Sequence, residues 1–257
     1  MPVFAASVPN YNNIGMASAA ISTKTGKLIA GKNQNIVLPL ASLTKLMTAL
    51  VLIDLKINLT KKVTITKAEV DYTTPYIAQG DITSKIDLVA GDKVTKDNLW
   101  HAMLIASSNE AAAALVDNSG ISRKEFVKRM NSKAKALGLT HTKFTEPSGI
   151  DPRNISTAKE MAIIARKAFQ TLAIRKIGIM PSYSYREINS GRKIYVSNRN
   201  PSLLAMNPLG MKVGYLTEAK INCATRLVKN NQDRVVVILH AHSNAARNVE
   251  IARVMKK

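Results

Sequence analysis

Strand and helix patterns occupy separate parts of this chain of 257 residues. Residues 16–32 predict two short strands around a Thr-Gly turn, and residues 211–217, 222–229 and 234–241 predict three more. The run 235–239 is apolar and β-branched, as is typical of a central strand. Because the strand patterns lie at both chain ends, we expect one sheet assembled from both ends, with a helical lobe inserted between them.

The intervening residues follow helical periodicity. Apolar residues recur over 42–55 at the spacing of one helical face, and Thr95 is expected to cap a helix that reaches about residue 105. Further helices are predicted over 110–116, over 123–137 with Gly138 at its end, and from Ser156 or Thr157 to about 171. Residues 244–256 predict a closing amphipathic helix, with one face formed by Ala246, Val249, Ile251 and Val254.

This order places the chain in the α/β (α+β) class, as an antiparallel sheet flanked by helices with an inserted, mostly helical lobe. The length fits a single domain, 16–257, preceded by a flexible segment, 1–15. We expect a sheet lobe formed by about 16–41 and 178–257, and a helical lobe formed by about 42–177. The polar residues 230–233 are expected to connect the last two strands.

Positive charge is the main compositional bias. Lys and Arg number 37 against 17 Asp and Glu, which gives a formal net charge of +20 and attracts polyanions. A specific nucleic-acid binder is not expected, because only 5% of the residues are aromatic and the positive residues are spread. The longest apolar stretch, 46–55, contains Asp54 and is too short for a membrane span. No signal peptide is visible, and the single cysteine excludes an intrachain disulfide.

The first motif that could carry chemistry is a Ser-x-x-Lys pair. Ser42 begins a predicted helix, and Lys45 lies on the same face one turn later. A buried lysine near other cations has a lowered pKa and can take the serine proton, so the pair is a candidate nucleophile. A later match, from Ser156 to Lys159, is interpreted as a helix cap followed by a solvent-facing lysine.

Two further motifs lie between helices and on a late strand. Ser107 could relay a proton to a leaving group, and the Asn109 carboxamide could bind a substrate amide or hold a lysine. Lys212 could bind a carboxylate, and Gly214 would let an extended peptide approach an edge strand closely. Each motif alone is weak, since Ser and Asn are also common helix caps.

The order Ser-x-x-Lys, Ser-x-Asn, Lys-x-Gly is the arrangement of penicillin-binding proteins and β-lactamases. With the stretches 38–49, 144–150 and 154–160, the chain resembles the low-molecular-mass penicillin-binding proteins, the serine D-alanyl-D-alanine peptidases of peptidoglycan, over about residues 16–243. It looks most like their small soluble DD-endopeptidase branch. The resemblance implies a penicillin-binding protein and β-lactamase-like transpeptidase fold, peptidoglycan stem peptides as substrates, β-lactams as covalent inhibitors, and no cofactor.

By this resemblance, Ser42 forms an acyl-enzyme and Lys45 is its general base. Ser107 passes a proton to the leaving amine, and Asn109 holds Lys45 and the substrate amide. The implied protein is an exported peptidase, periplasmic or associated with the cell wall. Whether it acts as a carboxypeptidase, an endopeptidase or both stays open.

The resemblance also implies how the substrate is held. Lys212 supplies positive potential for the substrate carboxylate, and the Tyr215 N–H completes an oxyanion hole with that of Ser42, beside Gly214. Where the family has threonine this chain has Val213, which keeps the branched shape and loses the hydroxyl. We therefore expect weaker carboxypeptidase activity and penicillin binding, with less effect on the cleavage of cross-links. A literal Lys-Thr-Gly at 24–26 precedes the serine and is interpreted as a hairpin turn.

Alternative functions stay open at this point. A serine β-lactamase shares the motif order and needs a carboxylate that activates water, for which Glu146 lies in the right region. A catalytically weakened, basic wall-binding relic of the same fold would also account for the charge, which otherwise gives weak attraction to anionic wall polymers. Metal chemistry is not expected, because His240 and His242 have no acidic third ligand nearby, and Cys223 is expected to be a small buried residue.

Overall fold

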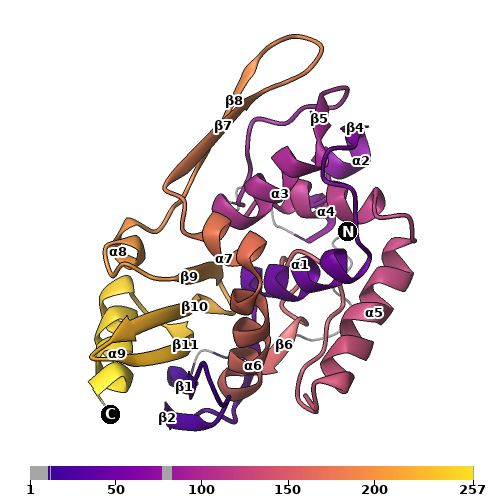
Figure 1. The fold of residues 1–257 in the computed structure, drawn as a ribbon. Coiled ribbons are helices and arrows are strands. Elements are labelled where there is room, and N and C mark those ends of the chain that lie inside the picture. Colours follow the sequence, from indigo (N-terminus) through magenta and orange to yellow (C-terminus); the bar gives the residue numbers. More distant parts are fainter. Residues whose placement is uncertain (1–10, 12, 77–82, 257) are drawn as a thin grey trace.

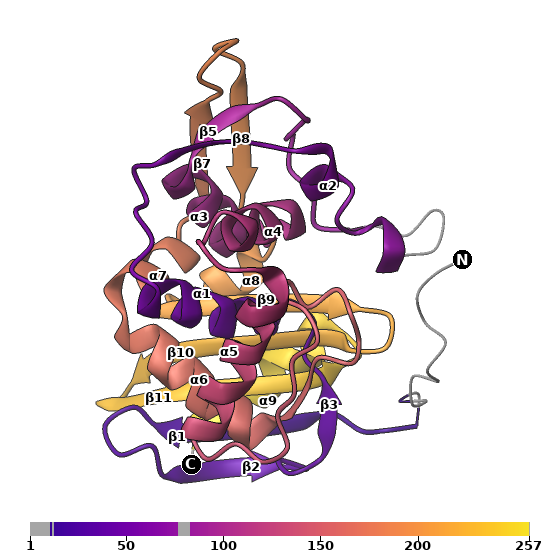
Figure 2. The same cartoon turned by 90° about the vertical axis from the view of Figure 1, so that its right-hand side faces the viewer.

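The computed structural model describes residues 11, 13–76 and 83–256. Most of the expected flexible segment 1–15, namely residues 1–10 and 12, lies outside the described residues. A five-stranded sheet forms one part of the molecule, and a group of helices lies beside it (Figure 1). Turning the molecule by 90° shows the sheet strands running across the lower half, with helices in front and behind (Figure 2).

All neighbouring strands of the sheet are antiparallel, in the order β2-β1-β11-β10-β9. The strands are β1 (Ala17–Ser22), β2 (Leu28–Lys32), β9 (Gly210–Leu216), β10 (Lys220–Lys229) and β11 (Gln232–Ala241). Two come from the N-terminal end and three from the C-terminal end, which confirms the predicted sheet. The β-branched run 235–239 lies in β11, the middle strand, and β9 forms one edge.

Helices cover both faces of the sheet because both faces are apolar. On β1 and β11, alternate side chains belong to different buried clusters, as the two-residue period of a strand requires. One cluster contains Val235 and Val237 and packs on α6 (Ala158–Gln170), and the other contains Val236 and Ile238 and packs on α9 (Asn244–Lys256). The bounds of α9 are those predicted for the closing helix, residues 244–256.

The predicted apolar face of α9 is wrong at one residue. Val249 is 70% exposed, whereas Ile251, Val254 and Met255 are buried against the sheet. The buried side also contains the Arg247 guanidinium, which donates to amide and hydroxyl oxygens nearby. A polar side chain with hydrogen-bond partners can thus lie on the buried face of a helix, where a hydrophobic pattern predicts an apolar residue.

The connection between β10 and β11 is shorter than the predicted 230–233. Only Asn230 and Asn231 form the turn, with φ angles of 49° and 59°. Lys229 pairs directly with Gln232, and Val228 with Asp233, so those two polar residues belong to the strand. Two residues with positive φ match the twist of a tight hairpin, and asparagine tolerates this conformation.

The helical part begins with a short 3₁₀ turn. The predicted helix 42–55 is divided into η1 (Ala41–Leu43) and α1 (Thr44–Asp54), and α1 is buried on nearly all sides. Thr95 caps α3 (Lys96–Ile105) as predicted, in a reciprocal capping box with Asn98. The remaining helices are α2 (Lys67–Val70), η2 (Thr74–Tyr76), α4 (Asn109–Asp117), α5 (Arg123–Ala136), α7 (Leu172–Gly178) and α8 (Pro201–Leu204).

Three two-stranded pairs were not predicted from the pattern of the sequence. They are β3 (Val37–Pro39) with β6 (Ile155–Thr157), β4 (Lys62–Thr64) with β5 (Lys93–Thr95), and β7 (Ser182–Arg186) with β8 (Lys193–Ser197). The β7–β8 hairpin projects at the top of Figures 1 and 2. The β3–β6 pair matters most for function, because β3 leads directly into η1.

A pair of substitutions tests the observed orientation of α9. Ile251→Ala should lower the free energy of unfolding by about 2–5 kcal/mol, because it empties space in the buried interface with the sheet. Val249→Ala should change it by less than about 0.5 kcal/mol, because that side chain is exposed. Denaturant unfolding of both variants measures the difference, and equal losses would contradict the described face.

Candidate active site

Ser42 lies on the tight turn that leads from β3 into α1. The preceding residue, Ala41, has a φ of 47°, a left-handed conformation that is uncommon for a residue with a side chain. A Cβ atom at Gly149 would lie 1.9 Å from the Ala41 carbonyl oxygen, and one at Gly214 would lie 2.7 Å from the Ser42 amide nitrogen. Only glycine fits these positions, so two distant backbone segments pack closely around the serine turn.

The Lys45 side chain points from α1 toward this serine and is fully buried. Its Nζ donates to Ser42 Oγ at 3.0 Å, to Asn109 Oδ1 at 2.7 Å and to the Ser148 carbonyl oxygen at 2.6 Å. An ammonium group has three N–H donors, and each has an acceptor here. The predicted Ser42–Lys45 pair and Asn109 are therefore in direct contact.

Burial lowers the pKa of Lys45 from its usual 10.5 to about 7. The charges of two buried carboxylates, Glu146 and Glu110, act in the opposite direction and limit the decrease. At neutral pH a large fraction of this amine is therefore unprotonated and carries a free lone pair. A lysine with that property can accept a proton from the adjacent serine hydroxyl.

Ser107 occupies the short connection between α3 and α4, as predicted, whereas Asn109 is the first residue of α4, one residue earlier than the predicted helix start. Ser107 has a φ of 62°, and Ser108 caps α4 by accepting from the Ala111 amide at 3.0 Å. This cap begins α4 at Asn109, whose side chain then reaches Lys45. The left-handed residue and the cap together direct two polar side chains into the site.

Lys212 lies on the edge strand β9 and is buried. Its Nζ donates to Ser107 Oγ at 2.8 Å and to the Val213 carbonyl oxygen at 3.1 Å. Burial, with a further contribution from the charge of Lys45, lowers its pKa well below 10.5. The structure thus places Lys212 of the Lys-x-Gly motif in contact with Ser107 of the Ser-x-Asn motif. Val213 itself is half-buried, and Tyr215 is 63% exposed beside Gly214.

Glu146 organises a loop that the sequence analysis did not connect with Lys45. Its carboxylate accepts from the Tyr72 hydroxyl at 2.5 Å, from the Ser148 amide at 2.6 Å, from Asn154 Nδ2 at 2.7 Å and from the Gly149 amide. Both oxygens are therefore occupied by protein donors. The bonds fix the loop whose Ser148 carbonyl accepts from the catalytic lysine candidate. A main-chain acceptor of this kind leaves no signature in residue types.

The remaining predicted candidates lie apart from these contacts. The Lys-Thr-Gly at 24–26 forms the turn after β1, where Gly26 has a φ of 74°. Ser156 is buried in β6, and it is Thr157 that caps α6, while Lys159 is exposed as expected. Cys223 is fully buried, and burial raises the pKa of its thiol to about 12, which makes it unreactive.

Histidine does not form a metal site in the part of the chain that is described. His240 is buried and His242 is exposed, with ring centroids 5.8 Å apart. Within residues 11, 13–76 and 83–256, no group of three or more His, Cys, Asp or Glu side chains is placed to hold a metal ion. In the same ranges, no helix combines the length and apolar character of a membrane span.

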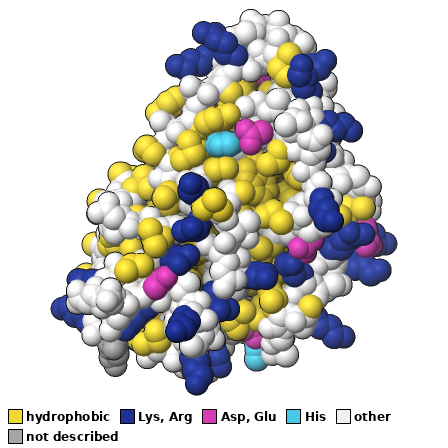
Figure 3. Space-filling model, viewed as in Figure 1, with side chains coloured by type: hydrophobic (Ala, Val, Ile, Leu, Met, Phe, Trp, Pro, Cys, Tyr) yellow, Lys and Arg dark blue, Asp and Glu magenta, His cyan; other side chains and the backbone are white. Residues whose placement is uncertain are grey.

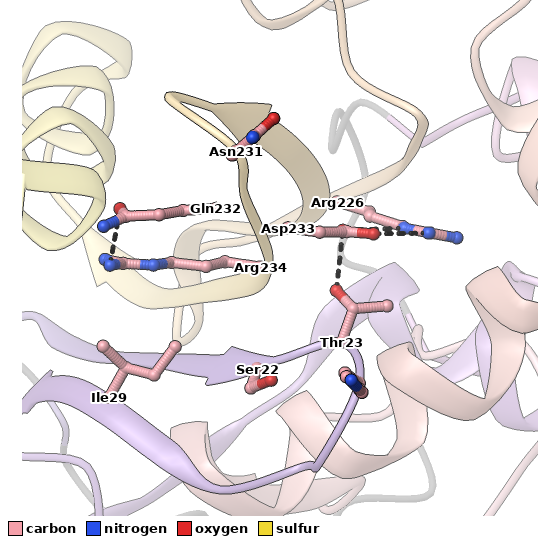
Figure 4. Close-up of a pocket in the computed structure, with 9 residues that line it drawn as sticks. Ser22, Thr23, Ile29, Arg226, Asn231, Gln232, Asp233 and Arg234 are labelled. Carbon is pink, nitrogen blue, oxygen red and sulfur yellow. Dashed lines mark hydrogen bonds and ion pairs between the residues drawn. The ribbon is translucent and has the colours of Figure 1, made fainter.

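A separate polar pocket of about 550 Å³ lies between the β1–β2 and β10–β11 turns (Figure 4). Its lining includes Asp233, whose carboxylate accepts from the Thr23 hydroxyl at 2.7 Å and from Nε and Nη2 of Arg226. The register places it at the end of β10 and β11 that is remote from Gly214.

On the face shown in Figure 3, Lys and Arg side chains are scattered rather than gathered in one patch.

Comparison with known proteins gives a consistent result. A family model described as D-alanyl-D-alanine carboxypeptidase matches residues 4–243. The chain is 32% identical to D-alanyl-D-alanine carboxypeptidase DacF of Bacillus subtilis, over 93% of this chain and 60% of that protein. It is 27% identical to a D-alanyl-D-alanine endopeptidase of Pseudomonas aeruginosa, over 98% of this chain and 79% of that one.

The structure also resembles solved structures along nearly its full length. A mutant of the Streptomyces K15 DD-transpeptidase superposes with a TM-score of 0.85 at 28% identity, covering 93% of this chain and 95% of that one. A D-alanyl-D-alanine carboxypeptidase from Mycobacterium tuberculosis superposes with a TM-score of 0.76 at 26% identity, covering 94% and 88%. The predicted fold is thereby confirmed.

Two glycines with positive φ test the packing around the serine turn. Gly149→Ala should lower the free energy of unfolding by more than about 2 kcal/mol, because the new Cβ would collide with the Ala41 carbonyl. Gly138→Ala, which meets no atom within 4 Å, should cost only about 1–2 kcal/mol for its left-handed backbone. Thermal or denaturant unfolding measures both, and equal losses would contradict the close approach.

Proposed function

The chain belongs to the D-alanyl-D-alanine carboxypeptidase family of serine peptidases, and from this premise we propose that it hydrolyses D-alanyl-D-alanine bonds of peptidoglycan stem peptides through an acyl-enzyme on Ser42. The observation that carries the proposal is the 3.0 Å contact between Ser42 Oγ and the buried Lys45 amine, whose pKa is about 7. The proposed activity includes release of a terminal D-alanine and cleavage of a D-alanyl cross-link.

In the acylation step, neutral Lys45 takes the proton of Ser42 while Oγ attacks the carbonyl carbon of the penultimate D-alanine. The amine can do so without losing its anchorage, because its two N–H groups keep Asn109 Oδ1 and the Ser148 carbonyl as acceptors. The buried acceptors thus direct the lone pair at the serine. This arrangement favours a general base over a purely structural lysine.

Collapse of the tetrahedral adduct breaks the bond to the leaving D-amino group, which needs a proton. Ser107 is the proposed donor, and its hydroxyl is held by Lys212 at 2.8 Å. Lys212 can replace the proton that Ser107 gives away, since its own pKa is depressed by burial and by Lys45. Before deacylation, Lys45 releases the serine proton to solvent and Lys212 regains a proton from it. Water then attacks the ester, neutral Lys45 takes the proton of the water, and it returns this proton to Ser42 Oγ as the shortened peptide leaves.

The oxyanion of the tetrahedral adduct needs donors near Ser42. The proposed donors are the backbone N–H groups of Ser42 and Tyr215. Support comes from Gly214, which lies so close to the Ser42 amide that a Cβ would approach it to 2.7 Å. Two fixed amides of this kind commonly supply a large share of the rate, about 3 kcal/mol for each donor.

The substrate carboxylate or cross-linked residue is proposed to lie along β9. This strand is at the sheet edge, where an extended peptide can add main-chain hydrogen bonds. Lys212 provides positive potential there, while Val213 provides no hydroxyl. A free terminal carboxylate loses more from that replacement than a cross-linked substrate does. We therefore propose that cross-link cleavage is favoured relative to carboxypeptidase activity and penicillin binding.

The alternative functions have less support. In a serine β-lactamase, a carboxylate must be free to activate water, whereas both oxygens of Glu146 accept from protein donors. A non-catalytic wall-binding relic would have no need of a complete Ser42, Lys45 and Asn109 contact set. The net charge of +20 supports weak, salt-sensitive attraction to anionic wall polymers. The proposed exported, periplasmic or wall-associated location rests on membership of the D-alanyl-D-alanine peptidase family.

The pH dependence of acylation tests the role of Lys45. The rate of acylation by a penicillin should rise about tenfold per pH unit below about pH 7 and level off above it, because only the neutral amine accepts the serine proton. Acylation reactions quenched at set times, with the intact mass of the protein determined at each time, give the rate at each pH. A rate that stays constant through pH 7 would contradict a lysine base.

Restoring the missing hydroxyl tests the role of position 213. Val213→Thr should increase penicillin acylation and release of terminal D-alanine, and should change cross-link cleavage much less. Val213→Ala is the control for altered shape without a hydroxyl. Digestion of purified linear and cross-linked muropeptides measures both activities, and an equal response of the two substrates would contradict the proposed preference.

A further inference from the structure

Asn222 is a fully buried polar residue of β10 that lies beneath the serine turn. Its Nδ2 donates to the Pro39 carbonyl oxygen at 2.8 Å, and its Oδ1 accepts from the His240 amide at 2.8 Å. Both side-chain groups are therefore used, and both partners are main-chain atoms. The side chain connects β11 of the sheet to the last residue of β3.

The His240 amide depends on this side chain because the ladder is irregular here. Ile221 pairs with Ala241 but Cys223 pairs with Ile238, so one extra residue of β11 is accommodated opposite Asn222. His240 has a φ of 62°, a strained value for a side-chain-bearing residue. The carboxamide oxygen of Asn222 thus replaces a ladder acceptor that the bulge removes.

The same residue is also linked to the other side of the serine turn. In the sheet register, Asn222 is directly opposite Gly214 of β9. Gly214 in turn approaches the Ser42 amide, and Tyr215 follows it. Asn222 is therefore connected through its side chain to the segment that enters the serine turn, and through its strand to the segment that carries the Tyr215 amide.

We propose that Asn222 is a positioning residue that fixes the separation between the Ser42 and Tyr215 amides, the two donors of the proposed oxyanion hole. The inference rests on the proposed function. Asn222 does not touch the substrate, and it acts through Pro39 and Gly214. A change in that separation weakens stabilisation of the tetrahedral adduct and leaves the initial, non-covalent binding of substrate nearly unchanged.

The main test is Asn222→Asp, which keeps the shape and the acceptor for the His240 amide but replaces the donor to Pro39 with an oxygen. The matched control is Thr225→Val on the same strand. Thr225 is equally buried, and its hydroxyl donates to the Gly210 carbonyl at 3.2 Å, remote from the serine turn. Both variants lose one buried bond from a side chain to a main-chain carbonyl.

The measurements are the acylation rate constant and the dissociation constant of the non-covalent penicillin complex, with unfolding temperature as the measure of stability. At saturating penicillin, Asn222→Asp should acylate about 10-fold to 100-fold more slowly than wild type. Removal of a whole oxyanion donor costs more, about 10²–10³-fold, because Asn222 only positions the donors. Its dissociation constant should stay within about twofold of wild type. Thr225→Val should lose stability but acylate at nearly the wild-type rate.

Acylation by Asn222→Asp at the wild-type rate would overturn the proposal, as would an equal loss in Thr225→Val. If Asn222→Asp does not fold, Asn222→Ala provides the same comparison without a buried charge, and a wild-type rate there would equally overturn it. Failure of the proposed function is distinguishable, because the wild-type protein itself would then neither acylate nor cleave muropeptides.

Discussion

The buried amine of Lys45 is the feature on which the rest of the site depends. Removing it from water lowers its pKa to about 7, and its three acceptors determine where its lone pair and protons can point. Each acceptor comes from a different element: the serine turn, the start of α4 and the Glu146 loop. Three separate elements thus orient one titratable group, and burial, limited by the charges of Glu146 and Glu110, brings its pKa close to neutrality.

The backbone around Ser42 is held in conformations that isolated residues rarely adopt. Ala41, which precedes Ser42, and Ser107, whose hydroxyl accepts from Lys212, both have positive φ. Such conformations persist only where the surroundings hold them, and the close approaches of Gly149 and Gly214 do so at the serine turn. The sheet edge and the helical lobe thus meet at Ser42, so the backbone conformation around Ser42 depends on both.

Much of the fold was predictable from the sequence because strand and helix patterns are strong and separate. The sheet, its middle strand and most helices are as expected. Lys45 contacts Ser42 and Asn109, while the catalytic roles assigned to the motif residues stay predictions. The failures have physical causes: Arg247 occupies the buried face assigned to Val249, and the two-residue turn at 230–231 depends on φ values. The Ser148 carbonyl and the Glu146 loop could not be foreseen, since main-chain acceptors are independent of residue type.

The most direct test of the account is the intact mass of the protein after incubation with a penicillin, for wild type and Ser42→Ala. The account predicts one stable penicillin adduct on the wild type and none on the variant, because Ser42 is the group that the buried amine activates. An adduct of equal extent on both proteins would contradict Ser42 as the nucleophile. No adduct on either, together with intact muropeptides, would contradict the proposed catalysis altogether.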